Sequence, residues 1–212
     1  MSDNLAIWDA LCRTDPTHTK SFNRAGGFKG TAIKPIWITR RLTEQFGPAG
    51  IGWGVNEPTF QVVSVEGEIL VYCTVSVWHT DRENLLWGVG GDKVQAKRKD
   101  GSFNDDEAFK KAFTDAVNNA VKSIGVGADV HMGLFDDDKY VTQAKAEFAA
   151  EDLPASVRIA LDKIRELDTE PLLKAWWKGN SSAIPESHYE QVVKALNDRL
   201  AQIKTLDIAR AG

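Results

Sequence analysis

The stretch NDDEAFKKAFTDAVNNAVKSIGVG, residues 104–127, predicts one long helix and decides the fold. Asn104 and Glu107 have the spacing of a capping box, and Gly125 and Gly127 predict the helix end because glycine readily adopts left-handed dihedrals. Large apolar residues recur every three or four positions beside a row of alanines. They are Phe109, Phe113, Val117, Val121 and Ile124, and Ala108, Ala112, Ala116 and Ala120. Because small residues allow close approach, we expect a sheet to pack on this helix.

The opposite face of the same helix is polar and weakly basic. Its members are Lys110, Lys111, Thr114, Asn118, Asn119, Lys122 and Ser123, with Asp115 as an acid. Two interpretations remain open, a solvated back face and a surface that lies along the phosphates of a nucleic acid.

The segment before this helix reads as a sheet. Residues 59–65, 68–78 and 85–89 are strand-like, and Glu66-Gly67 is typical of a short hairpin turn. The middle strand alternates with one fully apolar face, which predicts a sheet covered on that side. The sequence therefore predicts an α+β fold, an antiparallel β-meander backed by a long helix. Residues 36–46 predict a further helix that Pro35 begins.

The pattern changes after Pro154, where only helices follow. We therefore expect two domains, 1–150 and 151–212. A helical module of about 55 residues is too small to bury a large core, so it is expected to dock on a partner.

Composition restricts the possible functions. The 212 residues carry a net charge of −4, so any anion-binding site must be local. Cys12 and Cys73 lack metal-ligand spacing and suit a reducing cytoplasm. We expect neither a signal peptide nor a membrane span.

Positive charge is concentrated in two segments. Residues 13–41 carry seven basic residues against one acid, Asp15, around the glycine-rich RAGGFKGT of residues 24–31. Glycines let backbone amides approach a phosphate, although the spacing of a P-loop is absent. The second segment holds Lys93, Lys97, Arg98 and Lys99 on an expected mobile loop. For both segments the alternative is an ordinary solubilising surface.

Signals for catalysis are weak. His18, His79, His131 and His188 are scattered, and motifs for hydrolases, zinc enzymes and dinucleotide binding are absent from the sequence. The acids of residues 136–138 are interpreted as a turn or helix cap rather than a metal site. We expect no catalytic residue, metal or cofactor.

Two blocks of the sequence resemble the signature of Rad-fifty-two-type single-strand annealing proteins, which include phage recombinases of the Sak, Erf and Redβ groups. The first block is GGFKGTAIKPIWITRRLTEQFG followed by Gly-Trp, and the second is TDAVNNAVKSIG followed by FDDDKY. The matching positions in the first block are Gly26, Gly27, Lys29, Ile33, Phe46, Gly47, Gly52 and Trp53. The resemblance covers about residues 20–142. It departs from the family at Asn118, Asn119 and Trp37, where the family carries basic residues.

The resemblance implies a protein of a phage, in the cytoplasm of a bacterial host, that binds single-stranded DNA and anneals complementary strands without ATP. It also implies a ring or helical homo-oligomer with DNA in a basic groove, and recombination as the process served. The DNA-binding residues expected from it are Lys29, Lys34, Arg40, Arg41, Lys97, Arg98, Lys99 and Lys122. Residues 155–212 would then recruit a host single-strand-binding protein or a phage exonuclease.

Two alternatives stay open. One is a small metal-dependent phage nuclease that uses acids such as Asp81, Asp92 and Asp136. The other is a structural adaptor that recruits a recombination partner through its C-terminal helices. Trp37, Trp53, Trp78 and Trp87 are either stacking platforms for bases or parts of the core and of subunit contacts.

Overall fold

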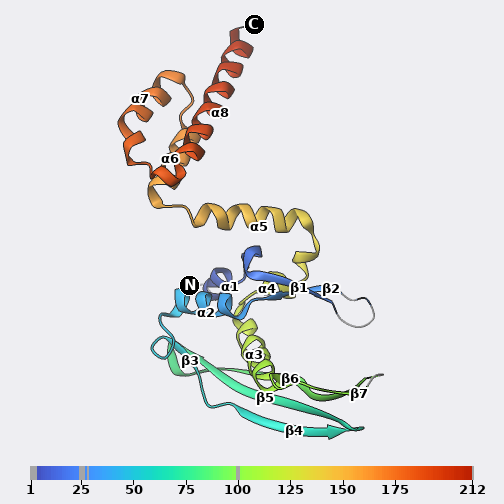
Figure 1. Cartoon of the computed structure of the whole chain (residues 1–212). Coiled ribbons are helices and arrows are strands. Elements are labelled where there is room, and N and C mark those ends of the chain that lie inside the picture. Colours follow the sequence, from blue (N-terminus) through green and yellow to red (C-terminus); the bar gives the residue numbers. More distant parts are fainter. Residues whose placement is uncertain (1–3, 24–26, 28, 99–100, 212) are drawn as a thin grey trace. The chain divides into compact units, whose positions relative to one another are not determined.

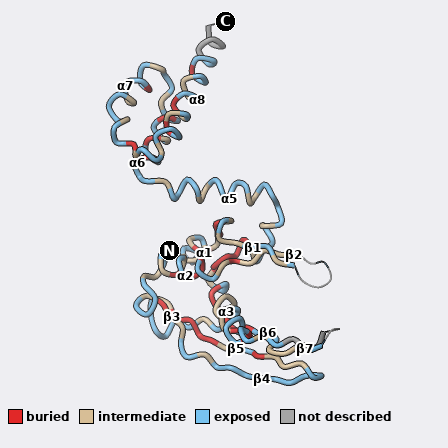
Figure 2. The backbone as a smooth tube through the Cα atoms, viewed as in Figure 1, coloured by how far each residue is buried: buried red, intermediate tan, exposed pale blue. Residues whose placement is uncertain are grey.

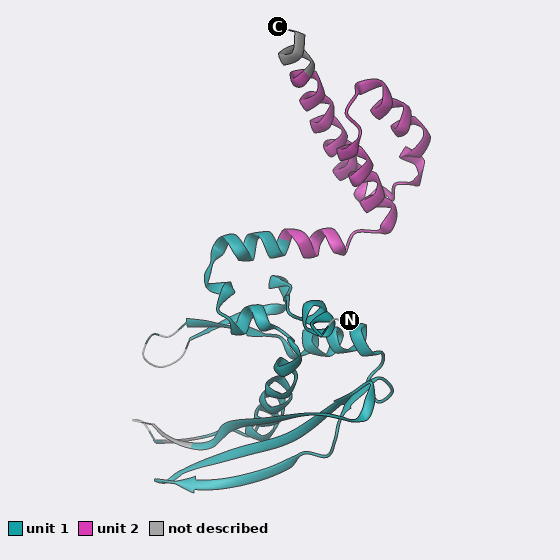
Figure 3. Cartoon of the chain, turned by 180° about the vertical axis from the view of Figure 1, so that it is seen from behind, with its two compact units in different colours: residues 1–145 teal, residues 146–212 magenta. Residues whose placement is uncertain are grey.

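A computed structural model describes residues 4–23, 27, 29–98 and 101–211. The chain forms two compact units, residues 1–145 and 146–212 (Figure 3). Their boundary and the predicted one at residue 150 both fall in helix α5, Asp138–Glu151.

Unit 1 combines helices with two antiparallel sheets and is of the α+β class, as predicted (Figure 1). Its first elements are α1 (Ala6–Leu11), the 3-10 helix η1 (Pro16–His18), β1 (Thr19–Asn23), β2 (Lys29–Ile33) and α2 (Pro35–Phe46). The larger sheet consists of β3 (Trp53–Val55), β4 (Thr59–Val65), β5 (Glu68–His79), β6 (Asp81–Arg98) and β7 (Gly101–Asn104). The last elements are α3 (Ala108–Val121), η2 (Lys122–Ile124), α4 (Ala128–His131), η3 (Leu134–Asp136) and the start of α5.

Strands β4 to β7 pair in chain order, each antiparallel to the next, and β3 pairs with the end of β5. This is the predicted meander. Glu66 and Gly67 have φ of 52° and 79°, the paired positive values of a tight hairpin turn. The separate pair β1–β2 flanks the glycine-rich stretch, of which residues 24–26 and 28 lie outside the described residues.

The mobile loop predicted after residue 89 is wrong. Strand β6 continues to Arg98 and pairs with β7 from Gln95 onward, so Lys93, Lys97 and Arg98 belong to a strand. The gap between the strands predicted at residues 68–78 and 85–89 is likewise much shorter than expected, since β5 ends at His79 and β6 begins at Asp81. Within this strand Gly90 faces α3 and permits its close packing, whereas Gly91 faces Tyr72 on the other side of the sheet.

Helix α3 packs on β5 and β6 (Figure 1), and its alanine row is the buried part of the helix. Ala108, Ala112, Ala116 and Ala120 are each fully buried, whereas Phe109 is 42% exposed. A Cβ added at Gly88 would lie 2.1 Å from the Ala116 oxygen, and one at Gly90 would lie 2.2 Å from the Ala116 nitrogen. The backbones therefore approach closely, and the alanines, more than the phenylalanines, form the contact.

The prediction of the two helix ends is only partly confirmed. Asn104 ends β7 and caps nothing, because the chain turns from the sheet before α3 begins; Glu107 takes the N-cap position without a side-chain cap bond. Gly125 ends η2 with φ of 97°, as predicted, but Gly127 precedes α4 and has φ of 67°.

Burial divides the large sheet into a covered and an open face (Figure 2). Val71, Cys73, Val75 and Val77 of β5 are fully buried beneath α3. The other face exposes apolar side chains from three strands, and every residue of β4 is exposed. Exposed large apolar side chains on that face include Val63, Tyr72, Leu85, Trp87 and Val89.

Unit 2 is helical, with α6 (Ala155–Glu166), α7 (Glu170–Asn180), η4 (Ser181–Ala183) and α8 (Glu186–Ala211). Its small core draws on each of these helical segments apart from η4. The buried members are Val157, Ala160, Ile164, Leu173, Ile184, Val192, Leu196 and Ile203. The described helices include none long and apolar enough to cross a bilayer.

Candidate nucleic-acid interface

A groove of about 330 Å³ lies between the β1–β2 hairpin and α3. The hairpin gives it a mainly apolar wall, and the polar face of α3 gives it the opposite wall. Residues of α2 and α4 complete the lining. From these elements come Phe22, Thr31, Ala32 and Ile33; Asp115, Asn118, Asn119 and Lys122; and Ile38, Val130 and His131.

The polar wall is held in place by hydrogen bonds. Asn119 Nδ2 donates to the Val89 oxygen of β6 at 2.8 Å, and Lys122 Nζ donates to Asn119 Oδ1 at 2.8 Å. Asp115 Oδ2 accepts from the Gly91 nitrogen at 3.4 Å. These contacts orient Lys122 and also cover part of the backbone edge of β6.

The basic side chains of the groove are Lys122 and His131. Across the described residues, the Lys122 ammonium bonds to Asn119 and to no carboxylate. The pKa of His131 is lowered, first by desolvation and then by Lys122, while Asp129 opposes the shift. Since Lys122 disfavours a second positive charge beside it, a bound anion would raise the pKa of His131 again.

Asp129 anchors the α4 side of the groove. It is 2% exposed and accepts from the Thr14 nitrogen at 2.7 Å, the Thr14 hydroxyl at 2.8 Å and the Tyr140 hydroxyl at 2.9 Å. The pKa of Tyr140 is raised by desolvation and by this bond. A buried carboxylate is stable only with such partners, so Asp129 joins the N-terminal segment, α4 and α5. This role of Asp129 was not predicted from the sequence, because its partners Thr14 and Tyr140 are distant or give no local signal.

A second group of cations lies on α2. Arg40 Nε and Arg41 Nη1 contact the two oxygens of Glu44 at 2.7 and 2.6 Å, and both guanidinium groups lie near the Trp37 ring, at 5.3 and 5.6 Å from its centroid. Lys34 Nζ donates to the Thr17 oxygen at 2.8 Å. Although desolvation raises the pKa of Glu44, the bonds from Arg40 and Arg41 lower it overall. Glu44 is thus shared between the two arginines.

The structure thus distributes the predicted DNA-binding residues over several places. Within the described chain, Lys122 is the member of the set that lines the groove. Lys29 begins β2, two residues before Thr31 of the groove wall. Of the loop group, Lys97 and Arg98 end β6, and Lys99 lies outside the described residues. The polar face of α3 was predicted from the sequence, but the hairpin wall was not, because no local signal links the two.

The structure separates the four tryptophans that were candidates for base stacking. Trp37, Trp53 and Trp78 are buried, as core residues, whereas Trp87 is 67% exposed. Among the described residues no three histidine, cysteine, aspartate or glutamate side chains gather as a metal site would require. The nuclease alternative, with Asp81, Asp92 and Asp136 on one metal, therefore receives no support from their placement.

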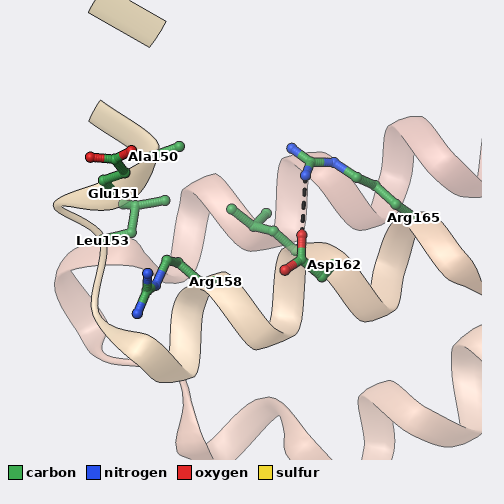
Figure 4. Close-up of a pocket in the computed structure, with 7 residues that line it drawn as sticks. Ala150, Glu151, Leu153, Arg158, Asp162 and Arg165 are labelled. Carbon is green, nitrogen blue, oxygen red and sulfur yellow. Dashed lines mark hydrogen bonds and ion pairs between the residues drawn. The ribbon is translucent and has the colours of Figure 1, made fainter. Parts of the chain in front are cut away.

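Unit 2 has a smaller hollow of about 210 Å³ where the end of α5 meets α6 (Figure 4). Leu153 and Leu161 provide apolar surface, and the charged lining residues are of both signs: Glu151, Arg158, Asp162 and Arg165. Arg165 Nη1 contacts Asp162 Oδ1 at 3.2 Å. Apolar surface beside charged groups of both signs suits a short amphipathic protein segment.

Comparison with known proteins finds neither a family model nor a curated protein that matches this sequence.

Proposed function

We propose that this chain binds single-stranded DNA and anneals complementary strands without ATP, in phage recombination, within a fold of the Rad-fifty-two-like annealing type. The groove between the β1–β2 hairpin and α3 is the observation that carries the proposal. It combines an apolar wall with a polar wall that bears Lys122, and His131 of α4 completes the lining.

This combination suits an extended nucleic-acid strand. Cations bind phosphates without reading sequence, and amide groups such as those of Asn118 and Asn119 contact sugars and phosphates. An annealing protein must leave base edges free to pair, so few charges per subunit and reversible binding are expected. Asp115 on the same wall limits the positive charge further.

Assembly would compensate for a weak site in one subunit. In a ring or helical homo-oligomer, neighbouring grooves act on one strand, and the second contact becomes intramolecular. Arg40 and Arg41, which share Glu44, would extend the track beyond the groove.

Complementary fluorescent oligonucleotides test the proposal, with and without Mg²⁺. The expected result is faster annealing of intact strands in both conditions and in the absence of ATP. Degradation that requires Mg²⁺ would instead indicate the nuclease alternative. If the folded protein binds neither strand, the adaptor alternative is left. The hollow of unit 2 is the observation that favours that alternative.

A further inference from the structure

Strand β4, Thr59–Val65, forms an unprotected edge of the large sheet. Among the described residues it pairs only with β5, which leaves a row of backbone donors and acceptors on its other side. All seven residues are exposed (Figure 2). Their sequence, TFQVVSV, contains no charge and no proline. Proteins usually protect such an edge with lysine, proline, a bulge or a cover.

The same sheet shows what protection looks like. On β6, the outward-facing groups Val89 O and Gly91 N are covered by the Asn119 and Asp115 side chains of α3. Strand β4 has no equivalent cover in the described chain. The contrast indicates that the β4 edge is available for pairing with a further β-strand.

We propose that β4 pairs antiparallel with β4 of a second copy about a two-fold axis at Val62. In this register all seven residues overlap, and any shift would leave some unpaired. Val62 faces Val62, Phe60 faces Ser64, Gln61 faces Val63, and Thr59 faces Val65. Isologous contacts of this kind are the commonest in homo-oligomers.

Charge and backbone chemistry favour this occupant. Glu66 would fall opposite Pro58 and Glu57 opposite Gly67, so no two acids meet although both ends of the strand are acidic. Pro58, without an N–H group, ends the ladder where the overlap ends. A second copy also satisfies two exposed edges in one contact, whereas a foreign strand satisfies one. The contact does not depend on nucleic-acid binding and adds to whatever contacts form the proposed larger assembly.

Charge placed on the axis tests the proposal. In the full chain, Val62→Lys and Val62→Glu each put like charges directly opposite each other, so each variant is expected to have at most half the wild-type mass by light scattering at micromolar protein. An equimolar mixture of the two variants should recover the wild-type mass, because lysine then faces glutamate. Thr59→Lys is the matched control, because its two copies would lie about 20 Å apart and should leave the mass unchanged.

Disulfide formation provides a second readout that does not rely on disruption. Val62→Cys should form a covalent dimer under mild oxidation, since directly opposed Cβ atoms lie about 5 Å apart, and Thr59→Cys should not. Wild-type mass for both charged variants, or a mixture that stays dissociated, would overturn the proposal. Equal cross-linking at positions 59 and 62 would overturn the register.

Discussion

The contact between α3 and β6 yields a sharp prediction for Gly90→Ala. The new Cβ would lie 2.2 Å from the Ala116 nitrogen and 2.4 Å from the Ala112 oxygen, whereas ordinary contacts begin at 3.4 Å. Both neighbours are backbone atoms, so α3 as a whole must move by about 1.2 Å, the difference between these contact distances, which would loosen the buried alanine row.

Overpacking of a core typically lowers the free energy of unfolding by about 1–3 kcal/mol. Because the clash here is with backbone atoms, we expect a loss of about 3 kcal/mol or more. For a domain of this size about 3 kcal/mol lowers Tm by about 6–12 °C. Urea and thermal unfolding of the full chain, followed by circular dichroism, measure this loss.

Gly91→Ala is the matched control in the same strand. Its Cβ would meet the Tyr72 ring at 3.0 Å, on the open face, where a side chain can move aside. We expect a change below about 1 kcal/mol. Equal stability of the Gly90 variant and the wild type, or equal losses at both glycines, would refute the proposed contact.

Three further predictions concern the groove and the tail. Asp129→Asn should destabilise unit 1 by about 2–4 kcal/mol in urea, because hydrogen bonds to a buried charge are lost, and Tyr140→Phe should cost less. The pKa of His131 is lowered in the free protein, so DNA binding should favour its protonation, and affinity should rise as pH falls from 8 to below about 6. His131→Gln should remove that part of the rise in fluorescence-anisotropy titrations, and an unchanged pH profile would exclude His131 from the site. Deletion of residues 155–212 should leave annealing in vitro intact while reducing recombination in cells; a folded but non-binding truncation would contradict the division of roles.

The sequence predicts those parts of the fold that have a local cause. Glu66-Gly67 indicates a hairpin because Gly67 readily adopts the positive φ that a tight turn requires, and Gly125 ends η2 for the same reason. The continuation of β6 had no such signal. Gly88 and Gly90 weaken a strand locally, and only the approach of α3 explains their presence.

In the candidate site, too, only the features with a local cause could be predicted from the sequence. Lys122, Asn118 and Asn119 share one helix face, which periodicity reveals, so the polar wall could be predicted. The wall formed by Phe22 and Thr31 could not, because its distance from α3 depends on how the hairpin packs. The pairing of Arg40 and Arg41 with Glu44 was also missed, although their spacing of four and three residues on one helix would have allowed it.

The central claim is that the groove holds phosphates, and a salt titration of single-stranded DNA binding tests it most directly. Lys122→Ala removes the cation that lines the groove, and Lys110→Ala removes one on the same helix that pairs with Glu107 at 2.6 Å. We predict that Lys122→Ala weakens binding to all sequences alike and makes the slope of log affinity against log salt shallower by about 0.7, the contribution of one single-strand phosphate. Lys110→Ala should leave affinity and slope as in the wild type. A folded Lys122→Ala protein with unchanged affinity and slope would contradict the claim that DNA lies in this groove.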